Sequence, residues 1–162
     1  MTDDNIVVWH NSYSIGIPLI DEQHKELIRL TNQLFASCVA GRESSKASFM
    51  ETIRGAVDYI GYHFSTEEKV MERVNYPDYL SHKKEHTKFV KEVLIEVDDF
   101  KSGRSFVPNA FVHFLKNWVL AHIAVCDKKL GEYLINLKKS GSLQGITLRV
   151  KQEANGQRLV IR

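Results

Sequence analysis

The sequence has few cysteines and no long apolar run. Its two cysteines, Cys38 and Cys126, are too few and too far apart for a disulfide framework, which favours a reducing cytoplasm. No apolar stretch approaches the roughly 18 residues that a membrane-spanning helix needs. The first residues also lack the cationic start and apolar run of a secretory signal. We therefore expect a soluble, cytoplasmic protein without a membrane span.

An excess of charge of one sign is also lacking. The 22 basic and 20 acidic residues give a formal net charge of +2 and are scattered along the chain. Because there is no basic stripe, nothing indicates binding to nucleic acid or to an anionic membrane. The 162 residues, 43% of them hydrophobic, are enough for one domain with a single core.

Four segments carry apolar residues at helical spacing. We expect helices over residues of about 19–40, 44–74, 79–100 and 108–140. Gly41 and Pro77 follow the first two segments as stop signals, and Pro108 suits the first turn of the last one. Short connections between such helices predict an all-α, antiparallel up-down-up-down four-helix bundle over residues 19–140. Residues 1–18 lack a helical period and end at a proline, so we expect an extended N-terminal arm.

Residues 143–162 follow a different period and predict a C-terminal β-hairpin. Apolar and polar residues alternate on both sides of Asn155-Gly156, which is a strong signal for a two-residue turn. Such a turn would pair Val150 with Ile161 and Gln152 with Leu159. The residues expected on one face of the hairpin are Ile146, Leu148, Val150, Leu159 and Ile161. Because a lone hairpin is only marginally stable, this face should rest on the bundle or on another chain.

Seven side chains able to bind iron recur along the helical segments: His24, His63, Glu67, His82, His86, His122 and Asp127. Residues four apart on an α-helix lie on the same face, which places Glu67 beside His63 and likewise His86 beside His82. His122 and Asp127 are five apart, about 140° around the helix, so we expect them to straddle a site. Burying these polar groups in apolar stripes without partners would cost several kcal/mol. The set therefore predicts a buried two-metal site in the bundle.

The types of ligand favour iron. Magnesium and calcium prefer all-oxygen ligands, and zinc would usually take four ligands per ion, which leaves this set over-supplied. Two octahedral ions have twelve coordination positions, of which five imidazoles, two bridging carboxylates and one bridging solvent oxygen fill eleven. The remaining position, on one iron only, suits a small diatomic ligand. The Glu-x-x-His repeats of oxygen-activating di-iron bundles are absent, which favours binding and release of O2 over its activation.

These residues, together with the segment from Trp9 to His24, make the chain resemble the hemerythrin family, and its bacterial members in particular. The similarity covers residues of about 7–138. It implies two non-haem iron ions per chain, bridged by an oxo or hydroxo group. It also implies which residues bind each ion: His82, His86 and His122 one iron, His24 and His63 the other, with Glu67 and Asp127 bridging both. The resemblance further implies that O2 binds reversibly beside His24 and His63.

The favoured function is reversible O2 binding, for carriage, storage, delivery or scavenging, with O2 as the ligand and no catalytic residues. Apolar residues within a turn of the ligands are candidates for a dry O2 pocket, although core packing alone also explains them. These candidates are Ile20, Leu27, Ile60, Phe64, Trp118, Val119 and Ile123. The alternatives are an O2 or redox sensor that signals through residues 143–162, a di-iron peroxidase or oxidase, and metal storage. Residues 143–162 are also candidates for self-association or partner docking.

Overall fold

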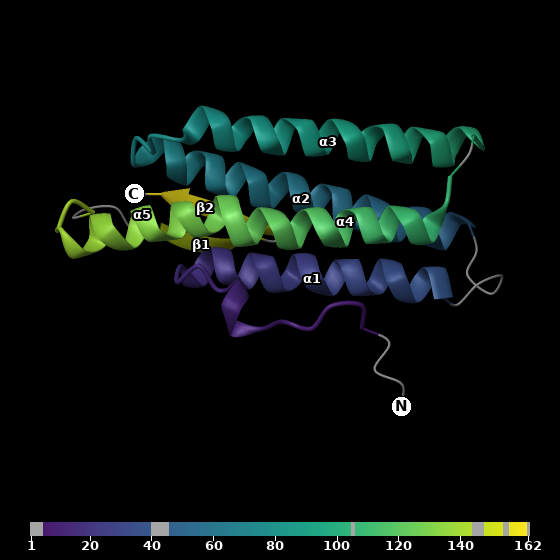
Figure 1. The fold of residues 1–162 in the computed structure, drawn as a ribbon, viewed down its shortest axis with the longest axis horizontal. Helices are drawn as coiled ribbons and strands as arrows, with labels where there is room; N and C mark the ends of the chain where they lie inside the picture. Colours follow the sequence, from purple (N-terminus) through teal and green to yellow (C-terminus); the bar gives the residue numbers. More distant parts are fainter. Residues whose placement is uncertain (1–4, 40–45, 105, 144–147, 154–155, 162) are drawn as a thin grey trace.

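The protein folds into four long helical rods. The computed structural model describes residues 5–39, 46–104, 106–143, 148–153 and 156–161. Within them the rods are α1 (Pro18–Val39), α2 (Lys46–Arg73), α3 (Tyr79–Ser102), and a last rod in which α4 (Pro108–His122), the π-helical η3 (Ile123–Asp127) and α5 (Lys128–Lys139) are continuous. Successive rods run in opposite directions (Figure 1). This confirms the predicted four-helix bundle. A candidate membrane-spanning helix is not found among the described residues.

Proline and residues with positive φ set several helix ends. Pro18 and Pro108 begin α1 and α4, where the missing backbone N–H leaves no hydrogen bond unmade. Asn75, with φ 51°, turns the chain after α2. Gly103, with φ 71°, ends α3, and its backbone N–H donates to the carbonyls of Asp99 and Phe100. The observed helix bounds lie within about two residues of those expected from the apolar period.

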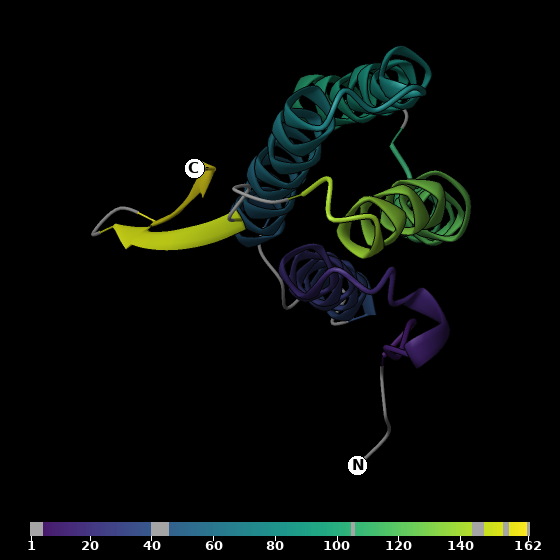
Figure 2. The ribbon, with the colours of Figure 1, turned by 90° about the vertical axis from the view of Figure 1, so that its left-hand side faces the viewer.

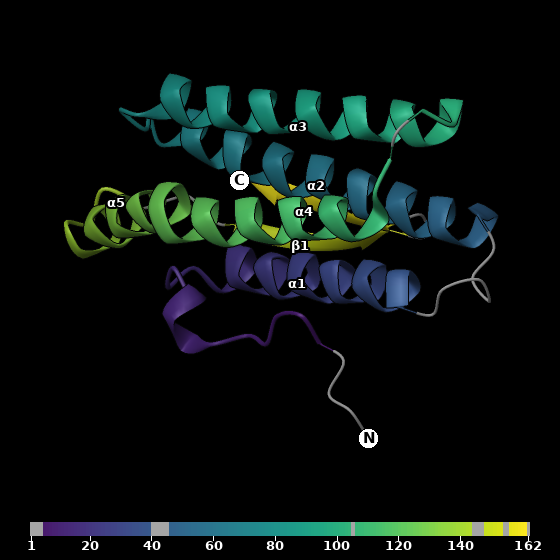
Figure 3. The ribbon, with the colours of Figure 1, turned by 45° about the vertical axis from the view of Figure 1, so that its right-hand side comes forward.

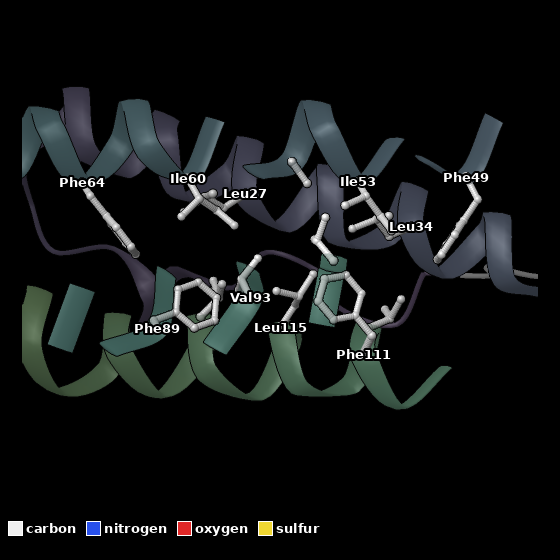
Figure 4. Packing of buried hydrophobic residues seen from close by; sticks show 14 of the residues in the cluster. Leu27, Leu34, Phe49, Ile53, Ile60, Phe64, Phe89, Val93, Phe111 and Leu115 are labelled. Carbon is white, nitrogen blue, oxygen red and sulfur yellow. The ribbon is translucent and has the colours of Figure 1, made fainter. Parts of the chain in front are cut away.

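Two apolar clusters fill the bundle at different levels along its axis. The larger one includes Leu27, Phe64 and Ile123, and Figure 4 shows it extending from Phe64 to Phe49. The smaller one lies toward α5 and the start of α1, and comprises Ile15, Ile20, Val70, Met71, Val74, Tyr76, Leu130 and Leu134. Along α1, α2 and the last rod, the expected metal ligands come between a residue of one cluster and a residue of the other. The ligands thus form a polar layer between two apolar ones.

The N-terminal segment packs along the bundle but is not uniformly extended. It contains a short 3-10 helix, η1 (Asn11–Tyr13), and its expected last residue, Pro18, already belongs to α1. The backbone N–H of Val7 donates to Oδ1 of Asn32 at 3.0 Å, and Nδ2 of Asn32 donates to the Val7 carbonyl at 2.8 Å. The Ile15 N–H donates to Oδ1 of Asp21 at 2.7 Å. These bonds fasten the segment to α1 at two places.

The C-terminal strands β1 (Leu148–Glu153) and β2 (Gly156–Ile161) pair antiparallel outside the four rods (Figures 2 and 3). The expected register is wrong by two residues, because Val150 pairs with Leu159 and Leu148 with Ile161. The observed register opposes apolar residues at both of these pairs, whereas a turn at Asn155-Gly156 would oppose Gln152 to Leu159. The expected apolar face, including Ile146, and part of the turn lie outside the residues whose side chains are described.

Candidate metal centre

All seven expected ligands are buried and converge between the four rods. α1 contributes His24, α2 contributes His63 and Glu67, and α3 contributes His82 and His86, while His122 ends α4 and Asp127 ends η3. Their donor atoms form two groups in which every atom lies within 4.8 Å of the others. The first group has five members: Glu67, His82, His86, His122 and Asp127. The second has four: His24, His63, Glu67 and Asp127.

The two carboxylates belong to both groups and turn one oxygen toward each. Oδ2 of Asp127 lies 3.2 Å from Nε2 of His24, and its Oδ1 lies 3.2 Å from Nε2 of His122. Oε1 of Glu67 lies 3.7 Å from Nε2 of His63, and its Oε2 lies 3.2 Å from Nε2 of His86. This arrangement suits two cations that share both carboxylates.

A π-helical turn decides how His122 and Asp127 relate. The expectation that they straddle the site assumed a regular α-helix, in which residues five apart diverge. In η3 the Lys128 N–H donates instead to the carbonyl of Ile123, five residues earlier. Such i→i+5 bonding brings residues five apart to about the same face, and π-turns of this kind occur often at functional sites. His122 and Asp127 therefore point to one place.

The buried polar atoms indicate that a cation belongs here. Within the described residues, both oxygens of Glu67, both oxygens of Asp127 and both ring nitrogens of His24 lack a hydrogen-bond partner. All three side chains are fully buried. Imidazole nitrogens lie 3.2 Å or more from the carboxylate oxygens without forming hydrogen bonds, so the buried carboxylates keep a desolvation cost that metal coordination removes. A mixed set of imidazoles and carboxylates is also what iron accepts, so the residues fit two iron ions.

The charges of the cluster point the same way. Burial alone would lower the pKa of His122, but Asp127 raises it to about 10. Burial would likewise lower the pKa of His82, but Asp127 and Glu67 raise it to about 9. Burial and Asp127 would raise the pKa of Glu67, yet the imidazoles around it lower it to about 2. The carboxylates therefore stay anionic and attract positive charge, which protons or metal ions supply.

Sequence reasoning missed the residues that orient the imidazoles. Oε1 of Gln23 lies 3.1 Å from Nδ1 of His63, and Nε2 of Gln23 donates to Oγ1 of Thr66 at 3.2 Å. Oε1 of Glu68 lies 3.3 Å from Nδ1 of His86. Such contacts fix the tautomer and ring orientation of a metal-binding histidine. Gln23 could have been found from the sequence, because it lies in the apolar stripe of α1, four residues before Leu27.

A small cavity of about 10 Å³ adjoins the cluster, close to the volume of one water molecule. It is lined by Leu27, Ile60, His63, Phe64, Phe89, Trp118, Val119, His122, Ile123 and Asp127. Six of the seven candidate pocket residues are in this set. Ile20 is not, because it packs in the smaller apolar cluster on the other side of the ligand layer.

Two aromatic side chains of the cavity wall also stack on expected ligands. Phe64 stacks on the His86 ring at 3.8 Å between centroids, and Trp118 stacks on the His122 ring at 4.3 Å. Trp118 also stacks on Phe89 at 3.8 Å. These contacts hold each of the two imidazoles against one aromatic face and make that part of the cavity wall apolar.

A four-helix bundle whose inner faces gather five imidazoles and two shared carboxylates defines a cation-binding bundle protein. Residues 15–134 match the family model described as the hemerythrin HHE cation binding domain. The chain therefore belongs to the hemerythrin family.

Individual relatives agree with this assignment. The chain is 34% identical over 123 residues to a bacteriohemerythrin of Stenotrophomonas maltophilia, covering 76% of this chain and 78% of that protein. It is 34% identical over 121 residues to a hemerythrin-like protein of Naegleria gruberi, covering 75% and 87%. Its fold is similar to a crystal structure of wild-type hemerythrin, with a TM-score of 0.73 and 26% identity over 78% of this chain and 96% of that one. The residues after 134, including both strands, lie beyond the family match.

Proposed function

We propose that this protein binds two non-haem iron ions at the cluster and uses them to bind O2 reversibly. The observation that carries the proposal is the inequality of the two donor groups, which have five and four members and share both carboxylates. An ion in the smaller group has one protein donor fewer. Iron in these groups would supply the electrons and the free coordination position that O2 binding needs.

The cavity would give O2 a place beside both donor groups. Its lining includes His63 of the smaller group, His122 of the larger one and the shared Asp127, and apolar side chains form the remaining wall. Water and protons would assist irreversible oxidation of the iron, and an apolar wall around a cavity of about 10 Å³ limits the access of both to the metal. Among the described residues of this wall, the ionisable side chains are His63, His122 and Asp127, all expected ligands. No separate acid or base is therefore at hand for an oxidase or peroxidase reaction, which favours binding.

The test is to load the metal-free protein anaerobically with ferrous iron, measure bound iron per chain, and record the visible spectrum under argon, air and argon again. We expect about two irons per chain and a band that appears with O2 and disappears when it is removed. The variant His24→Leu should retain one iron, in the five-donor group, and lose the reversible band. The matched variant His113→Leu removes an imidazole outside the cluster and should behave as wild type. An irreversible spectral change, or no colour, would contradict the proposal.

A second candidate function is O2 or redox sensing through residues 143–162. It is favoured by the position of α5, which begins directly after Asp127 and leads toward the strands. A displacement of Asp127 on O2 binding would thus be passed along one helix to a segment available for self-association or for a partner. Hydrogen exchange of residues 143–162 should then differ between the reduced and oxygenated forms. Identical exchange and an unchanged oligomeric state would remove this candidate.

A further inference from the structure

A second and much larger hollow lies at the end of the bundle where α1 begins and α2 and α5 end, on the left of Figure 1. Its volume is about 720 Å³, within the range typical of small-molecule binding sites. The described residues that line it are Gly16, Ile17, Pro18, Val70, Arg73, Val74, Leu134, Ile135, Lys138, Lys139 and Leu143. None of these is an expected metal ligand, so the groove is distinct from the metal centre.

The floor of this groove is apolar. Val70, Val74 and Leu134, which line it, are buried members of the smaller apolar cluster. Ile135 and Leu143 are half-buried and extend the apolar surface toward solvent. Ile17 is half-buried as well, so these three side chains keep apolar surface in contact with water, and an aliphatic chain that covers this surface gains free energy.

The charges on the lining are all of one sign. Arg73, Lys138 and Lys139 are its only charged residues within the described part of the chain, and all three are exposed. No ion pair to any of the three is found among the described side chains. Basic residues in the last turn of a helix also complement the helix dipole, so their presence alone indicates no ligand. Lys101, in the last turn of α3, has the same position in its helix but does not line this groove, which makes it a useful comparison.

We propose that the groove binds a long-chain fatty acid. The carboxylate would lie among Arg73, Lys138 and Lys139, and the acyl chain would cover Ile17, Ile135 and Leu143. A carboxylate satisfies the excess of positive charge at the rim through charge-assisted hydrogen bonds. The hollow has room for a chain of roughly 12 to 16 carbons with its headgroup at the opening. A neutral or cationic amphiphile would match the floor but not the rim.

The experiment is calorimetric titration of the full-length protein with dodecanoate, below the concentration at which it forms micelles. We expect saturable binding of one molecule per chain, weakening by roughly fourfold for each methylene removed from the ligand. Dodecanol and dodecyltrimethylammonium should bind at least about tenfold more weakly than dodecanoate. The triple variant Arg73→Gln, Lys138→Gln, Lys139→Gln should also bind dodecanoate at least about tenfold more weakly. All three substitutions are at exposed positions, so the fold should persist, and circular dichroism checks this.

The matched control removes the same charge elsewhere. The variant Lys84→Gln, Lys88→Gln, Lys101→Gln changes three exposed lysines of α3, and it should bind dodecanoate as the wild type does. Equal affinity for dodecanol and dodecanoate would overturn the proposal, because the cationic rim would then have no part in binding. Equal weakening in both triple variants would overturn it as well, since it would show a general charge effect. Absence of saturable binding would exclude the site.

Discussion

The contact between the N-terminal segment and α5 leads to a quantitative prediction at Gly131. This residue is buried in the first turn of α5, directly beneath the backbone of Ile15. A Cβ atom at Gly131 would lie 2.4 Å from the carbonyl oxygen of Ile15 and 2.8 Å from its Cβ. Both distances are below 3.0 Å, a limit that real Cβ atoms respect. Gly131→Ala therefore requires the segment or the helix to move.

Ile15 has little freedom to give way. It is 4% exposed, and its N–H is bonded to the Asp21 carboxylate at 2.7 Å. The neighbouring Ser14 accepts a hydrogen bond from Lys128 at its carbonyl and donates to Asp21 at 2.6 Å through its hydroxyl. Overpacking against such a fixed neighbour typically costs about 1–3 kcal/mol. The better helix propensity of alanine recovers about 0.8–1 kcal/mol, so we expect a net loss of up to about 2 kcal/mol in the free energy of unfolding.

Gly55→Ala is the matched control, because it makes the same chemical change at an exposed site in α2 where no heavy atom lies within 4 Å of the new methyl group. It should raise the free energy of unfolding by about 0.5–1 kcal/mol. Urea unfolding of the metal-free protein, followed by circular dichroism, measures both variants without the contribution of bound metal. A Gly131→Ala protein that is stabilised as much as the Gly55→Ala protein would refute the reasoning, since it would mean that the segment does not rest on α5.

Three further predictions concern the metal centre. In the metal-free protein, the pKa values of His82 and His122 are raised from 6.5 to about 9 and 10, so protonation of these side chains stabilises the fold below pH 6.5 and this stability is lost as the pH rises through the raised values. The melting temperature should show this loss for the metal-free protein but not for the iron-loaded protein. The same pH dependence of the melting temperature in both forms would contradict the prediction. Gln23→Leu removes the partner of a buried imidazole and should weaken iron binding in the four-donor group about 10–100-fold; unchanged competition with a chelator would argue against this role. Trp118→Leu opens the cavity wall and should hasten irreversible oxidation in air, whereas Trp9→Leu, away from the cavity, should not; equal rates would show that the wall does not protect the iron.

The α-helical period accounts for most of the site. Glu67 follows His63 by four residues, and His86 follows His82 by four, so each pair shares a helix face whatever the neighbouring helices do. The amphipathic stripes then turn these faces inward, because burying the apolar residues beside them drives the packing of the bundle. Local geometry and burial thus act in the same direction, which is why the donor atoms of all four rods converge as the sequence indicates.

The period fails where the hydrogen bonding of the backbone changes. The π-helical turn before Lys128 has an i→i+5 hydrogen bond in place of an i→i+4 bond, and it aligns His122 with Asp127. The sequence of this segment does not predict the π-helical turn. The strands likewise depart from the local signal. Asn155-Gly156 favours one register, but the observed register pairs Val150 with Leu159 and so places apolar residues opposite each other.

Ile20 shows that a residue on the same helix face as a ligand need not line the cavity. It precedes His24 by four residues and therefore points to the same side of α1, which made it a candidate for the cavity wall. One turn is also about 5.4 Å along the helix axis, and this displacement places Ile20 in the smaller cluster with Val70 and Leu130. The cavity lies on the opposite side of the ligand layer, beside Leu27. The azimuth read from a sequence therefore selects the residues that face inward, whereas the axial level, fixed by how the four rods are staggered, decides which of them meet the site.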